Sequence, residues 1–445
     1  MHWQSAKFCK TSKLGGTAEI IRPKQNSLGR FYLLNSFWEE IKVEIKKSKK
    51  MNNVHYDIRG PVAAMATEME RQGTPVIRLN TGNPAAFGFR PPDVASILED
   101  RLQLTAAYSD SKGLIEAREA IAEYEKTKGI PNIKIENIFT GNGVSELIAM
   151  CLQALLDSGD EVLIPSPDYP LWTASTRLAG GTAVHYLCDE SSDWYPDMDD
   201  MRRKISPRTK AIVVISPNNP TGAVYPKVIL EEICNLAREN NLLILSDEIY
   251  DRLLMDDAKH IAIASLAPDL PVITMNGLSK SHQLCGFRAG WMVVSGKLDG
   301  ASDYLDALTV LASMRLCSNV NAQAIIPAAL KDPHFSRDQL LPGGRLYEQR
   351  QQAYDGLNSI PGISAVKSRA GLYMFPKLDV KRLKIKNDER FVLEFLKAKH
   401  VLLTHGGSYN WNEPDHFRIV YLPEKQVLAD VIDRLKDFLE GYKQD

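Results

Sequence analysis

The chain alternates short apolar runs with longer segments in which apolar residues recur at the spacing of an α-helix. This alternation is typical of βαβ units, in which helices cover the faces of a mostly parallel sheet. Two of the runs, at 211–215 and 242–246, are apolar at almost every position, as strands buried on both faces are. The predicted strands are 76–80, 161–164, 183–187, 211–215, 242–246, 272–276 and 291–294. The predicted helices between them are 113–128, 145–157 and 230–241.

A second pattern follows the last of these strands. The stretch 303–331 predicts one long helix that leads toward a final, smaller unit. That unit mixes helices and strands: helices 344–359, 390–399 and 424–441, and strands 372–375, 401–403 and 417–421. We therefore expect an α/β protein with more than one packed domain. The expected division is a basic leader at 1–53, an N-terminal arm and joining segment at 54–100, a large domain at 101–330 and a small C-terminal domain at 331–445.

Length and composition narrow the class of protein. The chain has 445 residues, more than one hydrophobic core usually covers, and its 44% hydrophobic and 24% charged residues are ordinary for a globular protein. Lys and Arg total 54 against 55 Asp and Glu, so the net charge gives no reason to expect nucleic acid or membrane as partner. The sequence contains no run of 18 apolar residues, so it predicts no membrane span. The six cysteines form no CxxC pair, which favours reduced thiols in the cytoplasm, and the histidines show no metal-site spacing.

The charge is unevenly distributed along the chain. Residues 1–50 carry 11 Lys/Arg and 4 Asp/Glu, a net charge of +7, and end in a lysine-rich stretch before Met51. The stretch is poor in arginine, is not enriched in serine and has only a short apolar run, which argues against a targeting peptide. An appended leader before a working protein that starts near Met51 is the favoured interpretation. A targeting peptide and a basic interaction arm are the alternatives.

Four short motifs carry chemistry, three of them directly after predicted strands and the fourth at a strand-to-helix turn, and ligands bind at such places in parallel sheets. Lys280 follows the strand 272–276, and its amine can act there as a nucleophile or a proton carrier. Arg288 is close enough along the chain to serve the same pocket as a fixed cation for a phosphate. A lone lysine in such a place is usually a solvated loop residue, so this motif is weak by itself.

The other three motifs belong to the same predicted edge. Asp247 and Tyr250 follow one strand, so an acid and a phenol can face one pocket, although acids are common at such positions. The string SPNNPTG, at 216–222, predicts a rigid turn that directs the amide of Asn219. The string TGNGVSE, at 140–146, begins a helix with small residues, where backbone N–H groups can converge on an anion.

Taken in this order, the four motifs resemble the signature of the pyridoxal-phosphate aminotransferases of fold type I, class I/II. The resemblance covers the chain from about His55 to the C-terminus. Within that family it extends to the bacterial alanine (glutamate–pyruvate) aminotransferases, through YDIRGPV (56–62), LNTGNPAAFGF (79–89), PSPDYPLWTA (165–174) and HYLCDESSDW (185–194). It implies a mostly parallel seven-stranded sheet sandwiched by helices in a large domain, with a smaller α/β domain at the C-terminus.

The resemblance also implies roles with pyridoxal 5'-phosphate bound. Lys280 would form the covalent link to the coenzyme and move the proton during transamination, and Asp247 would pair with the protonated pyridine nitrogen. The other coenzyme contacts implied are Asn219 and Tyr250 at the ring oxygen, Ser279, Arg288 and the backbone N–H groups of Gly143 and Val144 at the phosphate, Tyr169 on the ring face, and Tyr108 from a neighbouring subunit. That last contact implies a homodimer. Gly277 stands where many relatives carry serine, which puts one phosphate contact in question.

Substrate recognition is implied at further places. Arg418 matches the family's reader of the α-carboxylate, which a guanidinium can grip through two parallel hydrogen bonds. The alternative interpretation is that Arg418 is an exposed residue of a strand. Gly82 would approach the substrate with its backbone, and Asn219 would contact it as well. Arg59 is our hypothesis for a second cation, which would bind the distal carboxylate of glutamate; a surface arginine is the alternative. For His405 an ordinary loop histidine is favoured over a substrate contact.

The function implied is a cytoplasmic enzyme that moves an amino group between L-alanine and 2-oxoglutarate, giving pyruvate and L-glutamate by a ping-pong mechanism. Its expected partners are small amino acids and 2-oxo acids, without metal, nucleic acid or membrane. An aminotransferase of branched-chain, aromatic or valine–pyruvate specificity remains open, as does a β-lyase or cyclopropane-forming synthase, because fold alone does not decide the reaction. A non-catalytic regulator is disfavoured, since the leader shows no convincing helix-turn-helix.

Overall fold

The computed structural model describes residues 44–99 and 101–444. The chain divides into two units, 1–48 and 49–445, and the second carries every element discussed below. Most of the predicted leader lies outside the described residues. Within the second unit, the 3-10 helix η1 (Lys49–Asn53) is anchored by Arg177, whose guanidinium donates to the carbonyl oxygen of Asn53 at 2.7 Å. No helix in the described part of the chain is long and apolar enough to cross a membrane.

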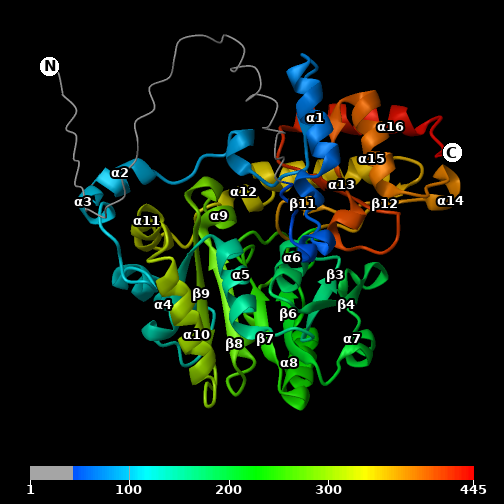
Figure 1. Ribbon diagram of the computed structural model, residues 1–445. Coiled ribbons are helices and arrows are strands. Elements are labelled where there is room, and N and C mark those ends of the chain that lie inside the picture. The colour runs from blue at the N-terminus through cyan, green and yellow to red at the C-terminus, as the bar shows by residue number, and fades with distance from the viewer. Residues whose placement is uncertain (1–43, 100, 445) are drawn as a thin grey trace, which may run out of the picture. The chain divides into compact units, whose positions relative to one another are not determined.

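A mixed sheet of eight strands forms the centre of the second unit (Figure 1). Its strands are β2 (Ile138–Asn142), β3 (Glu161–Ser166), β4 (Thr182–Asp189), β5 (Tyr195–Pro196), β6 (Thr209–Ile215), β7 (Leu243–Asp247), β8 (Val272–Gly277) and β9 (Ala289–Ser295). Their order is β2-β9-β8-β7-β6-β3-β4-β5, and β9 and β5 run against the other six. β9 is antiparallel because the short connection from β8 leaves no room for a crossover helix. The α/β fold with a mostly parallel sheet is confirmed, with one strand more than expected.

Helices cover both faces of this sheet because its strands are apolar on both faces. Along β6, Val213 and Ile215 pack on one side with α5, α6 and α10, whereas Ile212 and Val214 pack on the other side with α7 and α8. Next to β2 and β9, helices α4 and α11 complete this second layer. The bounds of these helices are α4 (Ile115–Thr127), α5 (Val144–Leu155), α6 (Leu171–Leu178), α7 (Met198–Lys204), α8 (Lys227–Asn240), α10 (Ser302–Met314) and α11 (Val320–Leu330).

The single long helix expected at 303–331 is wrong, because the structure has the two helices α10 and α11 there. Between them the chain turns toward the edge of the sheet, where the guanidinium of Arg315 donates to the carbonyl oxygen of Thr140 at 2.7 Å. The side chain of Asn319 then caps α11 by accepting from the backbone N–H of Ala322 at 3.3 Å. The apolar pattern continues across this turn, so periodicity alone could not reveal it.

The C-terminal region packs around three smaller sheets. β1 (Ile77–Arg78) pairs in parallel with β13 (Val401–Leu402), so the strand predicted at 76–80 joins this region and not the central sheet. Another sheet has the order β11-β15-β14, and Arg418 lies on its middle strand. The remaining strands are β10 (Ile363–Ser364), β11 (Tyr373–Met374), β12 (Lys377–Leu378), β14 (Thr404–His405) and β15 (Phe417–Val420). The remaining α-helices are α1 (Pro61–Arg71), α2 (Val94–Glu99), α3 (Leu102–Thr105), α9 (Leu278–Ser281), α12 (Arg337–Leu340), α13 (Arg345–Asn358), α14 (Val380–Leu383), α15 (Asp388–Lys399) and α16 (Lys425–Leu439).

Candidate active site

The motif residues gather at the carboxyl ends of the central strands. Asp247 is the last residue of β7, Asn219 follows β6, Lys280 lies in α9 directly after β8, and Gly143 follows β2. These four strands run in the same direction, so their ends reach one edge of the sheet, and Figure 1 shows β6, β7 and β8 side by side.

The amine of Lys280 is held inside this edge. Its Nζ donates to the carbonyl oxygen of Gly82 at 2.6 Å, and the Sγ of Cys285 lies 3.8 Å away. Burial by itself lowers the pKa of Lys280, but the electrostatic effects of Tyr373 and Cys285 outweigh burial and raise the pKa above its ordinary value. The amine is therefore a half-buried cation, in contrast to the solvated loop lysine that the sequence left open.

Asp247 is a buried acid with hydrogen bonds to both carboxylate oxygens. The indole Nε1 of Trp172 donates to Oδ2 and the backbone N–H of Ile249 donates to Oδ1, each at 3.3 Å. Burial raises the pKa of Asp247 to about 6, although both hydrogen bonds favour the ionised form. An acid buried in this way is suited to a cationic partner. Sequence reasoning missed Trp172, whose only signal was its place in the string PSPDYPLWTA.

A pair of buried tyrosines lies beside Lys280. The hydroxyl of Tyr250 donates to the hydroxyl of Tyr373 at 3.0 Å. Burial raises the pKa of Tyr250 well above its ordinary value, so its phenol stays protonated and able to donate. A Cβ on Gly82 would lie 2.1 Å from the hydroxyl oxygen of Tyr373, which explains the need for glycine there. Sequence reasoning missed Tyr373, because no local motif marks it.

Arg418 is a second cation at this place and is only 2% exposed, so the exposed-strand alternative is wrong. Its Nη1 donates to Oδ1 of Asn219 at 2.9 Å, and its Nη2 donates to the carbonyl oxygen of Asn80. The guanidinium carbon lies 4.1 Å from the ring centre of Tyr373 and 4.8 Å from that of Tyr409. Among the described residues its Nε has no hydrogen-bond partner. A buried guanidinium with an unused donor suits an anionic ligand.

A glycine turn and an arginine form a corner at the start of α5. The guanidinium of Arg288 donates to the hydroxyl of Ser145 at 3.1 Å. A Cβ on Gly143, which has a φ of +78°, would lie 2.0 Å from Nη2 of Arg288, so a larger residue would displace the arginine. The N–H of Gly143 already donates to the carbonyl oxygen of Gly141 at 2.7 Å, so one of the two expected backbone donors is engaged here. Val144 is the first residue of α5, where helical N–H groups lack partners within the helix.

The residues just before Lys280 are tightly packed. Ser279 is buried in α9. A Cβ on Gly277 would lie 2.5 Å from the carbonyl oxygen of Ala289 on β9. A serine at position 277 would therefore require β9 to shift, which gives a packing reason for the glycine that departs from the family pattern.

Three further predicted residues are half-buried or exposed. The half-buried Tyr169 shares a hydrogen bond between its hydroxyl and that of Tyr56 at 2.9 Å. Tyr108 is 79% exposed. Arg59 is exposed and lines a groove of about 420 Å³, to which Asn80 also contributes.

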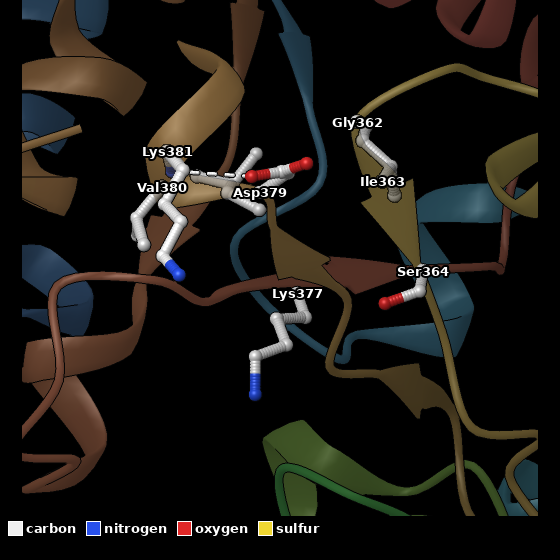
Figure 2. A pocket seen from close by; sticks show the side chains of 8 residues that line it. Gly362, Ile363, Ser364, Lys377, Asp379, Val380 and Lys381 are labelled. Carbon is white, nitrogen blue, oxygen red and sulfur yellow. Dashed lines mark hydrogen bonds between the residues drawn. The ribbon is translucent and has the colours of Figure 1, made fainter. Parts of the chain in front are cut away.

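A second hollow of about 420 Å³ lies in the C-terminal region. Figure 2 shows that β10, β12 and the start of α14 line it, with Lys377 and Lys381 as its cations. Lys377 forms an ion pair with Glu190 at 2.8 Å, and the carboxylate of Asp379 accepts from the backbone N–H of Lys381 at 3.1 Å. None of the residues that the resemblance implies lines this hollow, so it is not part of the candidate site.

A lysine after β8, a buried acid at the end of β7 and an arginine beside a glycine turn form the arrangement that the resemblance implies for an amino-group transferase. Residues 74–435 match the family described as aminotransferase class I and II, and the chain belongs to this family.

Individual relatives agree with this assignment. The chain is 54% identical over 403 residues to the glutamate-pyruvate aminotransferase AlaA of Escherichia coli (strain K12). The aligned region covers 90% of this chain and 99% of that protein. It is 52% identical over 402 residues to an alanine aminotransferase of Mycobacterium bovis, covering 89% and 93%. A solved alanine aminotransferase from Pyrococcus furiosus superposes with a TM-score of 0.84 at 41% identity, covering 89% of this chain and 100% of that one. The expected family and enzyme class are confirmed.

Proposed function

We propose that the protein is a pyridoxal-phosphate aminotransferase that moves an amino group between L-alanine and 2-oxoglutarate, giving pyruvate and L-glutamate. One observation carries the proposal: Lys280 binds the carbonyl oxygen of Gly82, and Arg418 binds that of Asn80. The amine of Lys280 and the guanidinium of Arg418, which would bind a carboxylate, therefore contact one short backbone segment. This arrangement suits an α-amino acid. The alanine, glutamate and pyruvate of the proposal come from the relatives, which are a glutamate-pyruvate aminotransferase and an alanine aminotransferase.

The side chains around Lys280 fit pyridoxal phosphate. Asp247 is a buried acid suited to a protonated ring nitrogen, and the corner at Gly143 and Arg288 suits a phosphate at the start of a helix. Bound there, the coenzyme supplies an aldehyde that accepts amino groups and a cationic ring that withdraws electrons. The other proposed contacts are Asn219 and Tyr250 at the ring oxygen, Ser279 and Val144 at the phosphate, and Tyr169 on the ring face.

Each residue has a separate task in the proposed ping-pong mechanism. Arg418 binds the α-carboxylate of the substrate, while Gly82 leaves room for the substrate beside Tyr373. With the coenzyme bound, Lys280 Nζ would take the proton from the substrate Cα. The rings of Tyr373 and Tyr409 cover the guanidinium of Arg418 and keep water away from it.

The proposal is tested by adding L-alanine to the coenzyme-loaded enzyme and recording the visible spectrum together with pyruvate. We expect loss of the absorption band of the lysine-linked coenzyme with matching release of pyruvate, and return of the band when 2-oxoglutarate is added. A stronger response to a branched-chain, aromatic or valine donor would assign a different specificity. Release of ammonia without an oxo-acid acceptor would identify a lyase.

We propose Arg59 as the cation that binds the distal carboxylate of glutamate. It shares its groove with Asn80, whose carbonyl oxygen binds Arg418. Arg59→Ala is expected to raise the KM for L-glutamate and 2-oxoglutarate by about tenfold or more and to leave that for L-alanine unchanged, because alanine has no distal carboxylate. Arg78 is the matched control: it lines the same groove but already pairs with Glu70 at 2.7 Å, so Arg78→Ala should not discriminate. Equal weakening of glutamate and alanine by Arg59→Ala would contradict the proposal.

We also propose a homodimer in which Tyr108 reaches the phosphate site of the partner. The high exposure of Tyr108 supports this, because a tyrosine usually buries its ring. Exposed apolar side chains near it in the chain and around the end of α10 suit a subunit interface: Leu102, Ile115, Val310, Met314 and Leu316. Sedimentation of the coenzyme-loaded enzyme should give the mass of two chains, and a single-chain mass would refute this assembly.

A cytoplasmic location completes the proposal. The described cysteines Cys151, Cys188, Cys234, Cys285 and Cys317 are all unpaired, as is usual in a reducing compartment. Cell fractionation should find the enzyme with the cytoplasmic proteins and not with the membranes.

A further inference from the structure

A lysine buried with three carboxylates lies beside the candidate site. The Nζ of Lys128, at the end of α4, is 2.5 Å from Glu125, 2.9 Å from Glu248 and 3.3 Å from Asp251. The side chain of Lys128 is 11% exposed, and those of the three acids are between 0% and 3% exposed. Neither the lysine nor its acids are among the residues proposed to bind coenzyme or substrate.

Other charged and polar groups surround this cluster. His260 Nε2 lies 2.9 Å from the carboxylate of Glu248, and the hydroxyl of Tyr124 donates to Asp251. The guanidinium of Arg252 lies over the ring of Tyr124, 4.5 Å from its centre. The indole of Trp291 on β9 donates to the carboxylate of Glu125 at 2.8 Å. Each of the three acids is therefore also bonded to a further side chain of the protein.

The loop after β7 faces both the site and the cluster. Asp247 and Tyr250 belong to the candidate site, while their immediate neighbours Glu248 and Asp251 bind Lys128. A displacement of the lysine would therefore move the loop that carries the ring-binding acid and phenol.

The same cluster reaches the end of β8. The carboxylate of Asp251 accepts from the amide of Asn276 at 2.7 Å. The side-chain oxygen of Asn276 accepts in turn from the N–H of Gly277 at 2.7 Å, where the chain enters the helix that carries Lys280. One ammonium thus connects the loops after two neighbouring strands.

We propose that Lys128 is a positioning residue for transamination, which fixes Asp247 and Tyr250 relative to Lys280 by binding Glu248 and Asp251 together. This inference rests on the proposed function. A stabilising role alone explains the cluster poorly, because buried ion pairs add little stability compared with apolar residues of the same size. Fixed geometry is what such a cluster can provide, and a misplacement of about 1 Å can reduce turnover by about a hundredfold.

The bonds of the three acids identify which one does not connect the two loops. Burial alone would lower the pKa of Lys128, but the three carboxylates outweigh it and hold the pKa well above its ordinary value. Burial opposes ionisation of Glu248 as well, yet Lys128 and His260 keep its pKa at about 2. Burial raises the pKa of Glu125 above its ordinary value, so this acid takes up a proton more readily than Glu248 does. Glu125 bonds to neither of the loops that follow β7 and β8, so Glu125→Gln is a matched control.

The experiment compares Lys128→Met, Lys128→Arg and Glu125→Gln in the coenzyme-loaded enzyme. The readouts are kcat, the KM for L-alanine, and the pH midpoint of the visible absorption of the bound coenzyme. We expect Lys128→Met to lower kcat by about a hundredfold with little change in KM, and to shift the midpoint by about half a pH unit or more. Lys128→Arg should recover most of the turnover, and Glu125→Gln should resemble the wild type.

The proposal is overturned if folded Lys128→Met keeps its kcat and absorption midpoint, or if Glu125→Gln changes both as strongly. If Lys128→Met does not fold, Asp251→Asn serves in its place, because it weakens the same bridge while keeping an acceptor for Asn276. A wild-type enzyme without turnover of L-alanine would contradict the proposed function itself. A wild-type enzyme that turns over L-alanine, with turnover insensitive to these substitutions, would contradict only the role of Lys128.

Discussion

Replacing Lys280 by arginine is expected to reduce transamination by about 10⁴-fold or more, because a guanidinium cannot give up its proton to act as nucleophile and base. The primary amine that contacts the carbonyl oxygen of Gly82 would be lost, although the positive charge would remain. Steady-state production of pyruvate from L-alanine measures the loss of turnover. The visible spectrum measures the second expected effect, which is absence of the band of the lysine-linked coenzyme.

The control for this substitution is Lys297→Arg. The side chain of Lys297 is 64% exposed, so exchanging its charged group there should leave both turnover and spectrum unchanged. Full turnover by Lys280→Arg would remove the basis of the proposed mechanism, since no other lysine has been placed at the site.

The central sheet could be predicted from the sequence because its signal is local. β3, β6, β7, β8 and β9 begin and end within two residues of the predicted runs. Strands covered by helices on both faces must be apolar at successive positions, and few other structures produce that pattern. The direction of the strands then predicts that Asp247, Lys280 and Asn219 lie at one edge of the sheet.

The contacts that complete the site could not be predicted, because they join distant parts of the chain. The bond between Lys280 and Gly82 spans 198 residues, and that between Tyr250 and Tyr373 spans 123. No periodicity encodes such pairs. The family resemblance indicated Gly82 and Arg418, but nothing in the sequence indicated that Tyr373 lies close to both.

The broken helix has a similar cause. Apolar residues continue at helical spacing from α10 into α11, so the local pattern predicts one helix. The turn between them is stabilised by Arg315, which binds the carbonyl oxygen of Thr140 in the middle of β2, 175 residues earlier in the chain. A tertiary contact therefore overrides the local preference, as it often does at the ends of helices.

Replacing Asp247 by asparagine is expected to abolish activity while making the coenzyme-free protein more stable. Burial raises the pKa of Asp247 to about 6 from an ordinary 3.8, so the folded state holds this proton more tightly than the unfolded state does. Stability should then fall as the pH rises from about 4 to about 6, and at pH 8 the buried carboxylate costs about 3 kcal/mol. Asparagine avoids that cost and keeps an oxygen that can accept from Trp172.

Urea unfolding of the coenzyme-free wild type and Asp247→Asn, at pH 4 and pH 8, measures this difference. The variant should gain stability at pH 8 and very little at pH 4, yet its turnover should fall by about a thousandfold or more, because no charge then balances the ring nitrogen. Asp269→Asn is the opposite control: the hydrogen bond from Arg238 lowers the pKa of this exposed acid to about 2, so losing its charge should slightly destabilise the protein at pH 8. If Asp247→Asn gains no stability at pH 8, burial does not destabilise the ionised carboxylate of Asp247. If it remains active, the carboxylate is not the partner of the coenzyme ring.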